Sequence, residues 1–142
     1  MYGTILIPLE NSATDEAILT HIRPLARLCK SRLVLVHVAD GFGARYQEAL
    51  NLADSEEVQG DREYLERRRA ELAAEGFDVS ATLAMGDPTK EVCAAAEREH
   101  ADLIAMSTHG HRFLQDLLLG SVAEGVRHRT QVPVLLVRAS KP

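Results

Sequence analysis

The 142-residue sequence predicts a single-domain α/β protein with a Rossmann-like architecture, an open five-stranded parallel sheet with helices on both faces. Short segments rich in Val, Ile and Leu alternate with longer helical segments, which is the pattern of right-handed crossover units. Most of the short segments are almost continuously apolar, as parallel strands buried on both faces are. The composition, 46% hydrophobic and 26% charged, is that of one globular domain with a substantial core, and we expect no second domain.

Five segments bounded by Gly, Pro, Asp or Asn are predicted to form the strands. They span residues 4–9, 32–39, 77–85, 101–107 and 132–138. Four of them are nearly continuously apolar and are expected to be buried on both faces. The segment 77–85, FDVSATLAM, alternates apolar and polar residues more regularly, so we expect it nearer an edge of the sheet.

The first helix is predicted over residues 13–29, where apolar residues recur with the period of an α-helix. This apolar face consists of Ile18, Ile22, Leu25 and Cys29. Pro24 lies inside the segment and is expected either to kink the helix or to remove one of its hydrogen bonds.

The next two helices carry their own boundary signals. Residues 56–75 are strongly charged and end at Gly76, a residue typical of helix C-caps. Asp87 and Pro88 open the following helix, because a capping carboxylate before a first-turn proline is a common helix start. Residues 40–55 give no clear signal, and we expect a loop with part of a helix there.

The last helix is predicted to begin near Ser121, because Ser121 and Glu124 have the spacing of a capping box. Before it, Leu114 and residues 117–119 could form a short helical turn of their own. The chain then ends with the fifth predicted strand.

Charge and composition argue against several classes of function. The net charge of −5 gives no electrostatic signature of nucleic-acid binding. The one basic run, Arg67 to Arg69, is flanked by acidic residues and is expected to be a solvated helix face. No apolar run approaches the roughly 20 residues that span a bilayer, and the N-terminus lacks a signal-peptide pattern, so we expect no membrane association and no export. Cys29 and Cys93 have no CxxC spacing and are expected to be reduced thiols, which suits the cytoplasm.

Two glycines, Gly110 and Gly120, stand on either side of nine residues between the fourth strand and the last helix. Folds of this class bind ligands at the carboxyl ends of the strands, and the free amides at a helix start suit a phosphate. Ser121 would add a hydroxyl and Arg112 a countercharge, so the segment is consistent with a phosphate cradle. The spacing fits equally well an alternative in which Gly120 ends a turn and Ser121 only caps the next helix.

Other nucleotide-binding and phosphate-accepting patterns are absent from the sequence. It contains neither GxxxxGK[ST] nor GxGxxG, so neither a P-loop ATPase nor a dinucleotide dehydrogenase is supported. A phospho-acceptor receiver domain needs an aspartate at the end of the third strand, and here Met85 and Gly86 stand there.

Three stretches carry a resemblance to a known family. PLENSATDEAIL follows the first strand, LVLVHV forms the second, and MSTHGHRFLQDLLLGSVAEGVRHRTQVPVLLVR makes up the C-terminal part. Together they resemble the universal stress protein family, over nearly the whole chain. The last stretch is similar to the GxxGx(9)G[ST] element of the nucleotide-binding members of that family.

This resemblance implies a site for ATP, AMP or another adenine nucleotide, with Mg²⁺ only if the nucleotide carries it. Pro8, Leu9 and Glu10 would border the adenosine, and the main chain at Val38 would meet the adenine edge. Ser107 and Gly110 would line the ribose and phosphates. The full set of implied nucleotide-binding residues is Pro8, Leu9, Glu10, Val38, Met106, Ser107, Thr108, His109, Gly110, His111, Arg112, Gly120, Ser121 and Val122.

Two of these positions depart from the family pattern. Ser107 stands where the family has the first motif glycine, which removes backbone freedom and adds a Cβ facing the ribose region. Glu10 stands where the family has an aspartate, one methylene shorter. Glu10 can still accept a hydrogen bond from a ribose or purine donor, and the alternative is an exposed loop acid.

The histidines do not predict a metal site or a catalytic group. His109 and His111 flank Gly110, but zinc needs further ligands, and no cysteine or third histidine lies nearby in sequence. His37, inside the second strand, is expected to be a hydrogen-bonded core histidine. No residue qualifies as a general base, so we expect no catalytic residue and at most slow ATP hydrolysis.

The resemblance therefore implies a cytoplasmic stress-response regulator whose client protein is unknown. It also implies a homodimer formed through the final strand, Val134 to Val137, whose edge would offer unpaired main-chain groups. The alternative within the family is a dimeric interaction module that binds no nucleotide. A third reading, an adenylate-forming enzyme, would need a second substrate pocket for which this short chain leaves little room.

Overall fold

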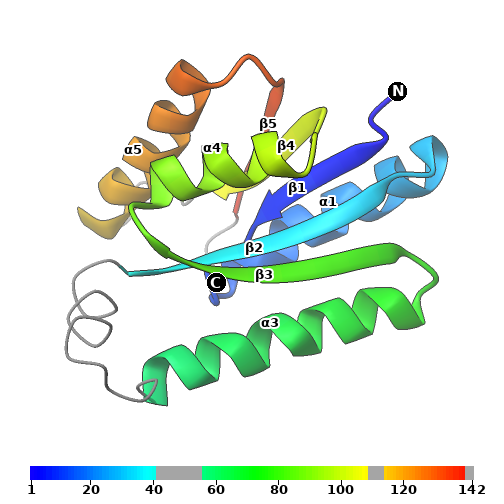
Figure 1. The fold of residues 1–142 in the computed structure, drawn as a ribbon, viewed down its shortest axis with the longest axis horizontal. Helices are drawn as coiled ribbons and strands as arrows, with labels where there is room; N and C mark the ends of the chain where they lie inside the picture. The colour runs from blue at the N-terminus through cyan, green and yellow to red at the C-terminus, as the bar shows by residue number, and fades with distance from the viewer. Residues whose placement is uncertain (41–55, 109–113, 140–142) are drawn as a thin grey trace.

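The computed structural model describes residues 1–40, 56–108 and 114–139, with side chains described at the same residues except 40 and 114–121. The elements run in the order β1 (Thr4–Pro8), α1 (Thr14–Cys29), β2 (Arg32–Asp40), α3 (Glu56–Ala74), β3 (Asp78–Gly86), α4 (Pro88–Arg98), β4 (Leu103–Thr108), α5 (Leu114–Arg129) and β5 (Val134–Arg138). Strands and helices alternate along the whole chain (Figure 1).

The five strands form one parallel sheet in the order β3-β2-β1-β4-β5. This confirms the predicted fold class, and β3 lies at an edge, as its alternating sequence indicated. The order runs one way from β1 through β2 to β3 and the other way from β1 through β4 to β5. The direction therefore reverses between β1 and β4, at the centre of the sheet.

Two helices cover each face of the sheet (Figure 1). On one face, α1 and α3 pack over side chains such as Ile5, Leu33 and Ala105. On the other, α4 and α5 pack over Leu6 and Ile104 and their neighbours. Successive strand residues enter opposite clusters because side chains alternate along a strand, which is why these strands are apolar almost throughout.

Two expectations about the C-terminal part were wrong. β5 is not buried on both faces, since it is an edge strand and its Leu136 is 42% exposed. The last helix begins at Leu114 and not near Ser121, so the leucine-rich segment and the last helix form one element. Leucine is a strong helix former, and a single glycine inside a helix costs only about 1 kcal/mol, which a continuous hydrogen-bond ladder can offset.

Two other helix boundaries agree with their predicted capping residues. The Asp87 side chain accepts a hydrogen bond from the Lys90 amide at 3.0 Å and so caps α4. Gly76 follows α3 with a φ of 97°, a left-handed conformation that favours glycine. The Gly76 amide donates to Ala73 O and the Phe77 amide to Leu72 O, which is the double hydrogen bond of a Schellman motif. α1 continues through Pro24, so the proline costs a hydrogen bond without ending the helix.

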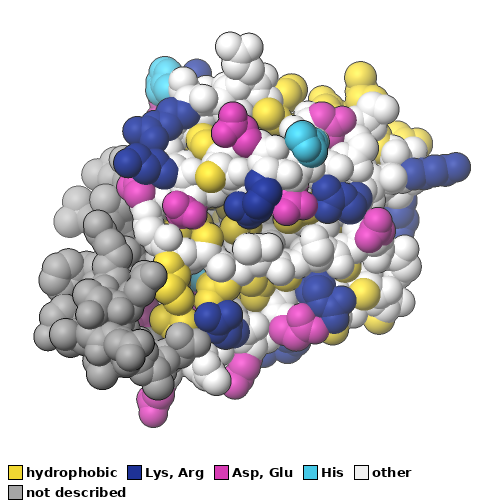
Figure 2. Space-filling view, viewed as in Figure 1, with side chains coloured by type: hydrophobic (Ala, Val, Ile, Leu, Met, Phe, Trp, Pro, Cys, Tyr) yellow, Lys and Arg dark blue, Asp and Glu magenta, His cyan; other side chains and the backbone are white. Residues whose placement is uncertain are grey.

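The surface seen in Figure 2 mixes charges of both signs. Lys and Arg side chains alternate with Asp and Glu over the face that carries α4, without a broad basic area among the described residues there. No helix in the described part of the chain is long and apolar enough to cross a membrane. Cys29 and Cys93 are free thiols, and burial raises the pKa of the Cys93 thiol, which keeps it protonated and unreactive.

Candidate functional site

The centre of the sheet opens at its carboxyl end. Pairing between β1 and β4 is limited to Ile5 with Leu103 and Leu6 with Ile104. Both strands continue beyond that point along their other neighbours, β1 along β2 as far as Pro8 and β4 along β5 as far as Thr108. The unpaired interval between β1 and β4 beyond that point, called the crevice below, lies where the strand order reverses, and open α/β sheets bind ligands at such points.

Val38 borders the crevice from the β2 side. The Val36 carbonyl accepts a hydrogen bond from the Leu9 amide at 2.7 Å, so the main-chain groups of Val36 face β1. Because these groups alternate sides along a strand, those of Val38 face the same way. β1 ends at Pro8, level with Val36, so the Val38 groups point beyond the end of β1.

Ser107 borders the crevice from the β4 side. The Ile104 amide donates to Pro133 O at 3.0 Å, and Thr108 O accepts from the Ala139 amide at 2.7 Å, so these even-numbered residues face β5. By the same alternation, the main-chain groups of Ser107 face β1. Val38 and Ser107 thus turn main-chain groups toward the same space from opposite sides.

The loop after β1 is held by one buried carboxylate, that of Asp15, which is fully buried. It accepts hydrogen bonds from the amides of Glu10 (2.9 Å), Asn11 (2.9 Å) and Ser12 (3.3 Å). The Tyr64 hydroxyl of α3 donates to the same carboxylate at 2.5 Å. Asp15 therefore fixes the turn that forms one wall of the crevice and ties that turn to α3.

Tyr64 is kept protonated by this arrangement. Burial, the larger cause, and the hydrogen bond to the Asp15 carboxylate together raise the pKa of its phenol to about 12. Arg68 donates to the same hydroxyl from its Nε at 3.1 Å and opposes the shift. At neutral pH Tyr64 is therefore a neutral hydrogen-bond donor.

His37 is a buried, hydrogen-bonded histidine, as expected. Its Nδ1 lies 2.7 Å from the Leu9 carbonyl and its Nε2 lies 3.2 Å from the Asp61 carboxylate. Both ring nitrogens therefore contact protein oxygen atoms, which fixes the orientation of the ring. Asp61 also accepts from the Asn11 side chain at 2.8 Å, which links α3 to the loop a second time.

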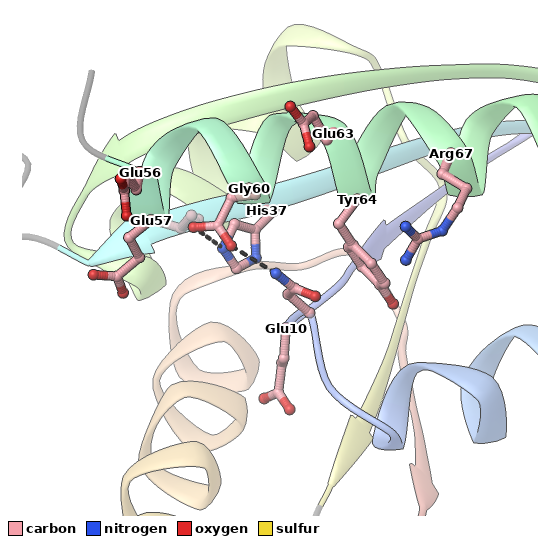
Figure 3. A pocket seen from close by; sticks show the side chains of 11 residues that line it. Glu10, His37, Glu56, Glu57, Gly60, Glu63, Tyr64 and Arg67 are labelled. Atoms are coloured by element: carbon pink, nitrogen blue, oxygen red, sulfur yellow. Dashed lines mark hydrogen bonds and ion pairs between the residues drawn. The ribbon is translucent and has the colours of Figure 1, made fainter. Parts of the chain in front are cut away.

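A cavity of about 640 Å³ opens between the ends of β1 and β2 and the first turns of α3 (Figure 3). Its lining residues are Glu10, Asn11, His37, Val38, Glu56, Glu57, Gly60, Asp61, Glu63, Tyr64 and Arg67. Figure 3 shows Glu56, Glu57, Gly60 and Tyr64 along α3, with the His37 ring beside Gly60. Five carboxylates and one arginine line this cavity, so it disfavours an anion.

The structure brings together part of the predicted site. Leu9 is buried at the end of β1, Glu10 accepts a hydrogen bond from the Thr14 hydroxyl at 3.0 Å, and Met106 is buried against the α4 and α5 side. Ser107 is 6% exposed, and its Oγ has no hydrogen-bond partner among the described residues. Among those residues, it is the one buried side-chain polar atom that forms no hydrogen bond.

The structure describes the other predicted residues only in part. His109, Gly110, His111 and Arg112 lie outside the described residues. Gly120 and Ser121 are the seventh and eighth residues of α5 and do not lie at its start. The structure does not describe their side chains. Val122 follows them in the same helix and packs against the α4 side of the core. The described residues contain no group of three or more His, Cys, Asp or Glu that could hold a metal ion.

Three residues of the site were not singled out from the sequence: Asp15, Asp61 and Tyr64. An acid in the first turn after Ser12 is a weak capping signal that could have drawn attention to Asp15. Asp61 and Tyr64 come from a helix about fifty residues further along, and nothing local in α3 indicates which of its polar residues meet β1 and β2.

The topology defines a class of protein, a doubly wound α/β domain whose strand order reverses between β1 and β4, the place where domains of this class bind ligands. The family follows from comparison with known proteins. The family model described as universal stress protein family matches residues 1–138, and the chain belongs to that family.

Comparison with individual proteins supports the family assignment. The chain is similar to universal stress protein MJ0577 of Methanocaldococcus jannaschii, 30% identical over 155 residues that cover 97% of this chain and 96% of the relative. The solved structure of hypothetical protein MJ0577 superposes with a TM-score of 0.84 at 32% identity, covering 100% of this chain and 99% of the other.

Two more distant structures share the fold and hold a ligand. A universal stress protein from Archaeoglobus fulgidus in complex with dAMP has a TM-score of 0.71 at 21% identity and covers 96% of this chain and 98% of its own. A universal stress protein in complex with cAMP has a TM-score of 0.69 at 21% identity and covers 98% of each chain.

Proposed function

We propose that this protein binds an adenine nucleotide, ATP or AMP, in the crevice between β1 and β4, and that it acts in the cytoplasm as a stress-response regulator. The observation that carries the proposal is the separation of these strands, with main-chain groups of Val38 and Ser107 directed into the gap. An adenine edge carries both a donor and an acceptor, and the N–H and C=O of Val38 supply one of each.

Charge decides the orientation of the ligand. The cavity beside Glu10 and Val38 is lined by five carboxylates, so the neutral adenosine end lies on that side. The phosphates then extend away from it, toward the glycine-containing segment between β4 and the middle of α5. Two proteins of the same fold that hold dAMP and cAMP lend support, since this architecture can accommodate an adenine nucleotide.

Phosphate binding by Gly120 and Ser121 carries a structural requirement. Amides inside an α-helix already donate to the carbonyl four residues earlier, so they have no hydrogen bond left for a phosphate. These two residues lie inside α5 here. The proposal therefore requires that α5 begin at Gly120 in the nucleotide-bound protein, which would free the first amides and direct the helix dipole at the phosphates.

The proposed role is binding and not catalysis. The cavity lining supplies carboxylates and the buried His37, whose two ring nitrogens already contact Leu9 and Asp61. A phosphoryl-transfer site needs an oriented water or acceptor together with positive charge on the transferred phosphate. Any ATP hydrolysis is accordingly expected to be slow, and a bound Mg²⁺ is expected only as part of the nucleotide.

The nucleotide that co-purifies with the protein tests the proposal. Wild type is expected to release an adenine nucleotide on denaturation, read by liquid chromatography and mass spectrometry, and to bind added ATP in calorimetry. Gly120→Val is expected to do neither, because the side chain blocks close approach to the main chain. Gly3→Val is the matched control, since a Cβ at Gly3 meets nothing within 4 Å and Gly3 lies at the opposite end of the sheet.

Folding of each variant is checked by its thermal melting curve, and Ser121→Ala provides a milder change at the same place. A wild-type protein that neither carries a nucleotide nor takes one up at millimolar ATP would overturn the proposal. In that case the interaction module that binds no nucleotide becomes the better description.

We also propose a homodimer formed through the final strand. β5 is an edge strand, and Leu136, between Val134 and Val137, is a large apolar side chain 42% exposed. An uncovered edge with an apolar side chain favours pairing with a second copy. Sedimentation should give a dimer that Leu136→Glu dissociates, while Leu28→Glu, a change at an 82% exposed leucine of α1, leaves it intact. A monomeric wild type would contradict this.

A further inference from the structure

Among the described residues, the Ser107 hydroxyl is the one buried side-chain polar group without a hydrogen-bond partner. Other buried polar side chains have partners: the Ser31 hydroxyl donates to Tyr2 O, Asp15 holds the loop after β1, and His37 contacts Asp61. Ser107 is 6% exposed, and its Oγ has no partner among the described residues. Burying a hydroxyl without a hydrogen bond is unfavourable, so such an atom calls for an explanation.

The position of Ser107 in the sheet explains why its hydroxyl has no partner among the described residues. Leu103 and Ala105 belong to the core cluster under α1 and α3, and side chains alternate along a strand, so the Ser107 side chain lies on that same face. Extending the register of Leu6 with Ile104 by three residues places Ser107 level with Leu9. β1 and β4 are no longer paired at this level, so the buried hydroxyl lies beside the crevice.

The charges on this side of the crevice restrict what the hydroxyl can meet. Glu10 follows Leu9 directly, and its amide is held by the buried Asp15 carboxylate at 2.9 Å. Two acids at this level disfavour a phosphate group. They do not disfavour a neutral sugar hydroxyl, which can both donate and accept and so pairs with a serine Oγ in either direction.

We propose that the Ser107 hydroxyl forms a hydrogen bond with a sugar hydroxyl of the bound nucleotide and makes the site selective for ribonucleotides over deoxyribonucleotides. This inference rests on the proposed nucleotide site and identifies one of its specificity-determining residues. Ser107 occupies the position where the family pattern has glycine, so this contact depends on a side chain that the glycine-bearing pattern does not supply.

A titration with three ligands tests the contact. ATP, 2′-deoxy-ATP and 3′-deoxy-ATP are titrated into wild type and into Ser107→Ala, with calorimetric detection. For wild type, removal of the contacted sugar hydroxyl is expected to weaken binding about tenfold, the usual effect of one lost hydrogen bond. Ser107→Ala should bind ATP about tenfold more weakly than wild type and should bind the analogue that lacks the contacted hydroxyl no more weakly than wild type does.

Thermal melting of the free proteins separates a ligand contact from a structural one. Ser107→Ala removes a hydroxyl that has no partner among the described residues, so its melting temperature should equal or exceed that of wild type. Ser31→Ala is the matched control at the other end of the sheet. It removes a hydroxyl that donates to Tyr2 O, so it should lower the melting temperature and leave ATP affinity unchanged.

The outcomes distinguish the inference from the function beneath it. If Ser107→Ala binds all three nucleotides as wild type does, or loses affinity equally for all three, the sugar contact is wrong and the nucleotide site stands. A lower melting temperature for free Ser107→Ala also contradicts it, since the hydroxyl then has a partner within the protein. If wild type binds none of the three, both the site and the contact fail.

Discussion

At both ends of the sheet, one aspartate carboxylate collects the main-chain amides next to β1. At the amino end, Asp102 accepts from the amides of Gly3 at 2.9 Å and Thr4 at 3.0 Å, and it is exposed. At the carboxyl end, Asp15 accepts from three amides and from Tyr64, and it is fully buried. The same chemistry is used in two very different environments.

The two ends of the sheet also differ in how their polar groups are paired. At the amino end, α1 and α4 end in left-handed residues, Lys30 and His100, that close Schellman motifs, and the Ser31 hydroxyl is paired. These main-chain and side-chain groups are satisfied within the chain. At the carboxyl end, β1 and β4 separate and Ser107 Oγ is left without a partner among the described residues. One end completes the fold, and at the other a hydrogen-bonded loop lies beside two strands that are no longer paired.

The largest expected effect comes from removing the buried carboxylate. Asp15→Ala leaves three amides and the Tyr64 hydroxyl without their acceptor inside the protein, and it should lower the free energy of unfolding by about 3 to 5 kcal/mol. Urea denaturation followed by circular dichroism measures it. Asp102→Ala is the control, and an equal loss in the two variants would mean that burial does not distinguish the two ends.

A smaller loss of stability is expected when the Tyr64 hydroxyl of α3 is removed. Tyr64→Phe removes the hydrogen bond to Asp15 together with the one from Arg68, and it should cost about 1 to 2 kcal/mol at neutral pH. The folded-state pKa of about 12 lies above the unfolded value near 10, so this contribution is complete below about pH 10 and is lost as the pH rises toward 12.

Phenol absorbance provides the direct measurement for Tyr64. A pH titration of wild type minus that of Tyr64→Phe should isolate one phenol that ionises near pH 12. Ionisation near pH 10 would show that the contact with Asp15 is not formed in solution.

The smallest effect is expected at the exposed aspartate. Burial alone would raise the pKa of Asp102, but hydrogen bonds from the Thr4 and Gly3 amides outweigh it and hold the pKa below its usual range. Asp102→Asn keeps one acceptor oxygen and should cost about 1 kcal/mol, since solvent screens an exposed carboxylate. Because the folded pKa is lowered, the advantage of wild type is present above about pH 4 and is lost as the pH falls through the folded pKa.

The measurement for Asp102 is a series of denaturation curves from neutral to acid pH. The two proteins should converge in stability in acid. A gap that stays constant with pH would mean that the carboxylate charge has no part in holding the two amides.

The fold was predictable because its signals are local or periodic. The apolar runs gave the strands, the alternation at 77–85 gave an edge strand, and Asp87 and Gly76 marked helix boundaries within a few residues of themselves. The start of α5 was missed because Ser121 and Glu124 have capping spacing, while the preceding leucines favour continuing the helix.

The site was predictable only in part. The strand ends and the resemblance drew attention to Glu10, Val38 and Ser107, and all three lie at the carboxyl end of the sheet. The sequence carried no sign that α3 would meet this end through Asp61 and Tyr64, since both contacts span about fifty residues.

The sequence by itself determined the alternation of strands and helices, the parallel sheet and the family, because hydrophobic period, capping and turn residues act over a few positions. Only the tertiary structure decided where β1 and β4 part, which carboxylate is buried beneath the loop, and that the Ser107 hydroxyl is left without a partner among the described residues. These depend on which distant side chains reach the same point, and burial, charge and hydrogen bonding there are properties of the assembled fold and not of any one segment.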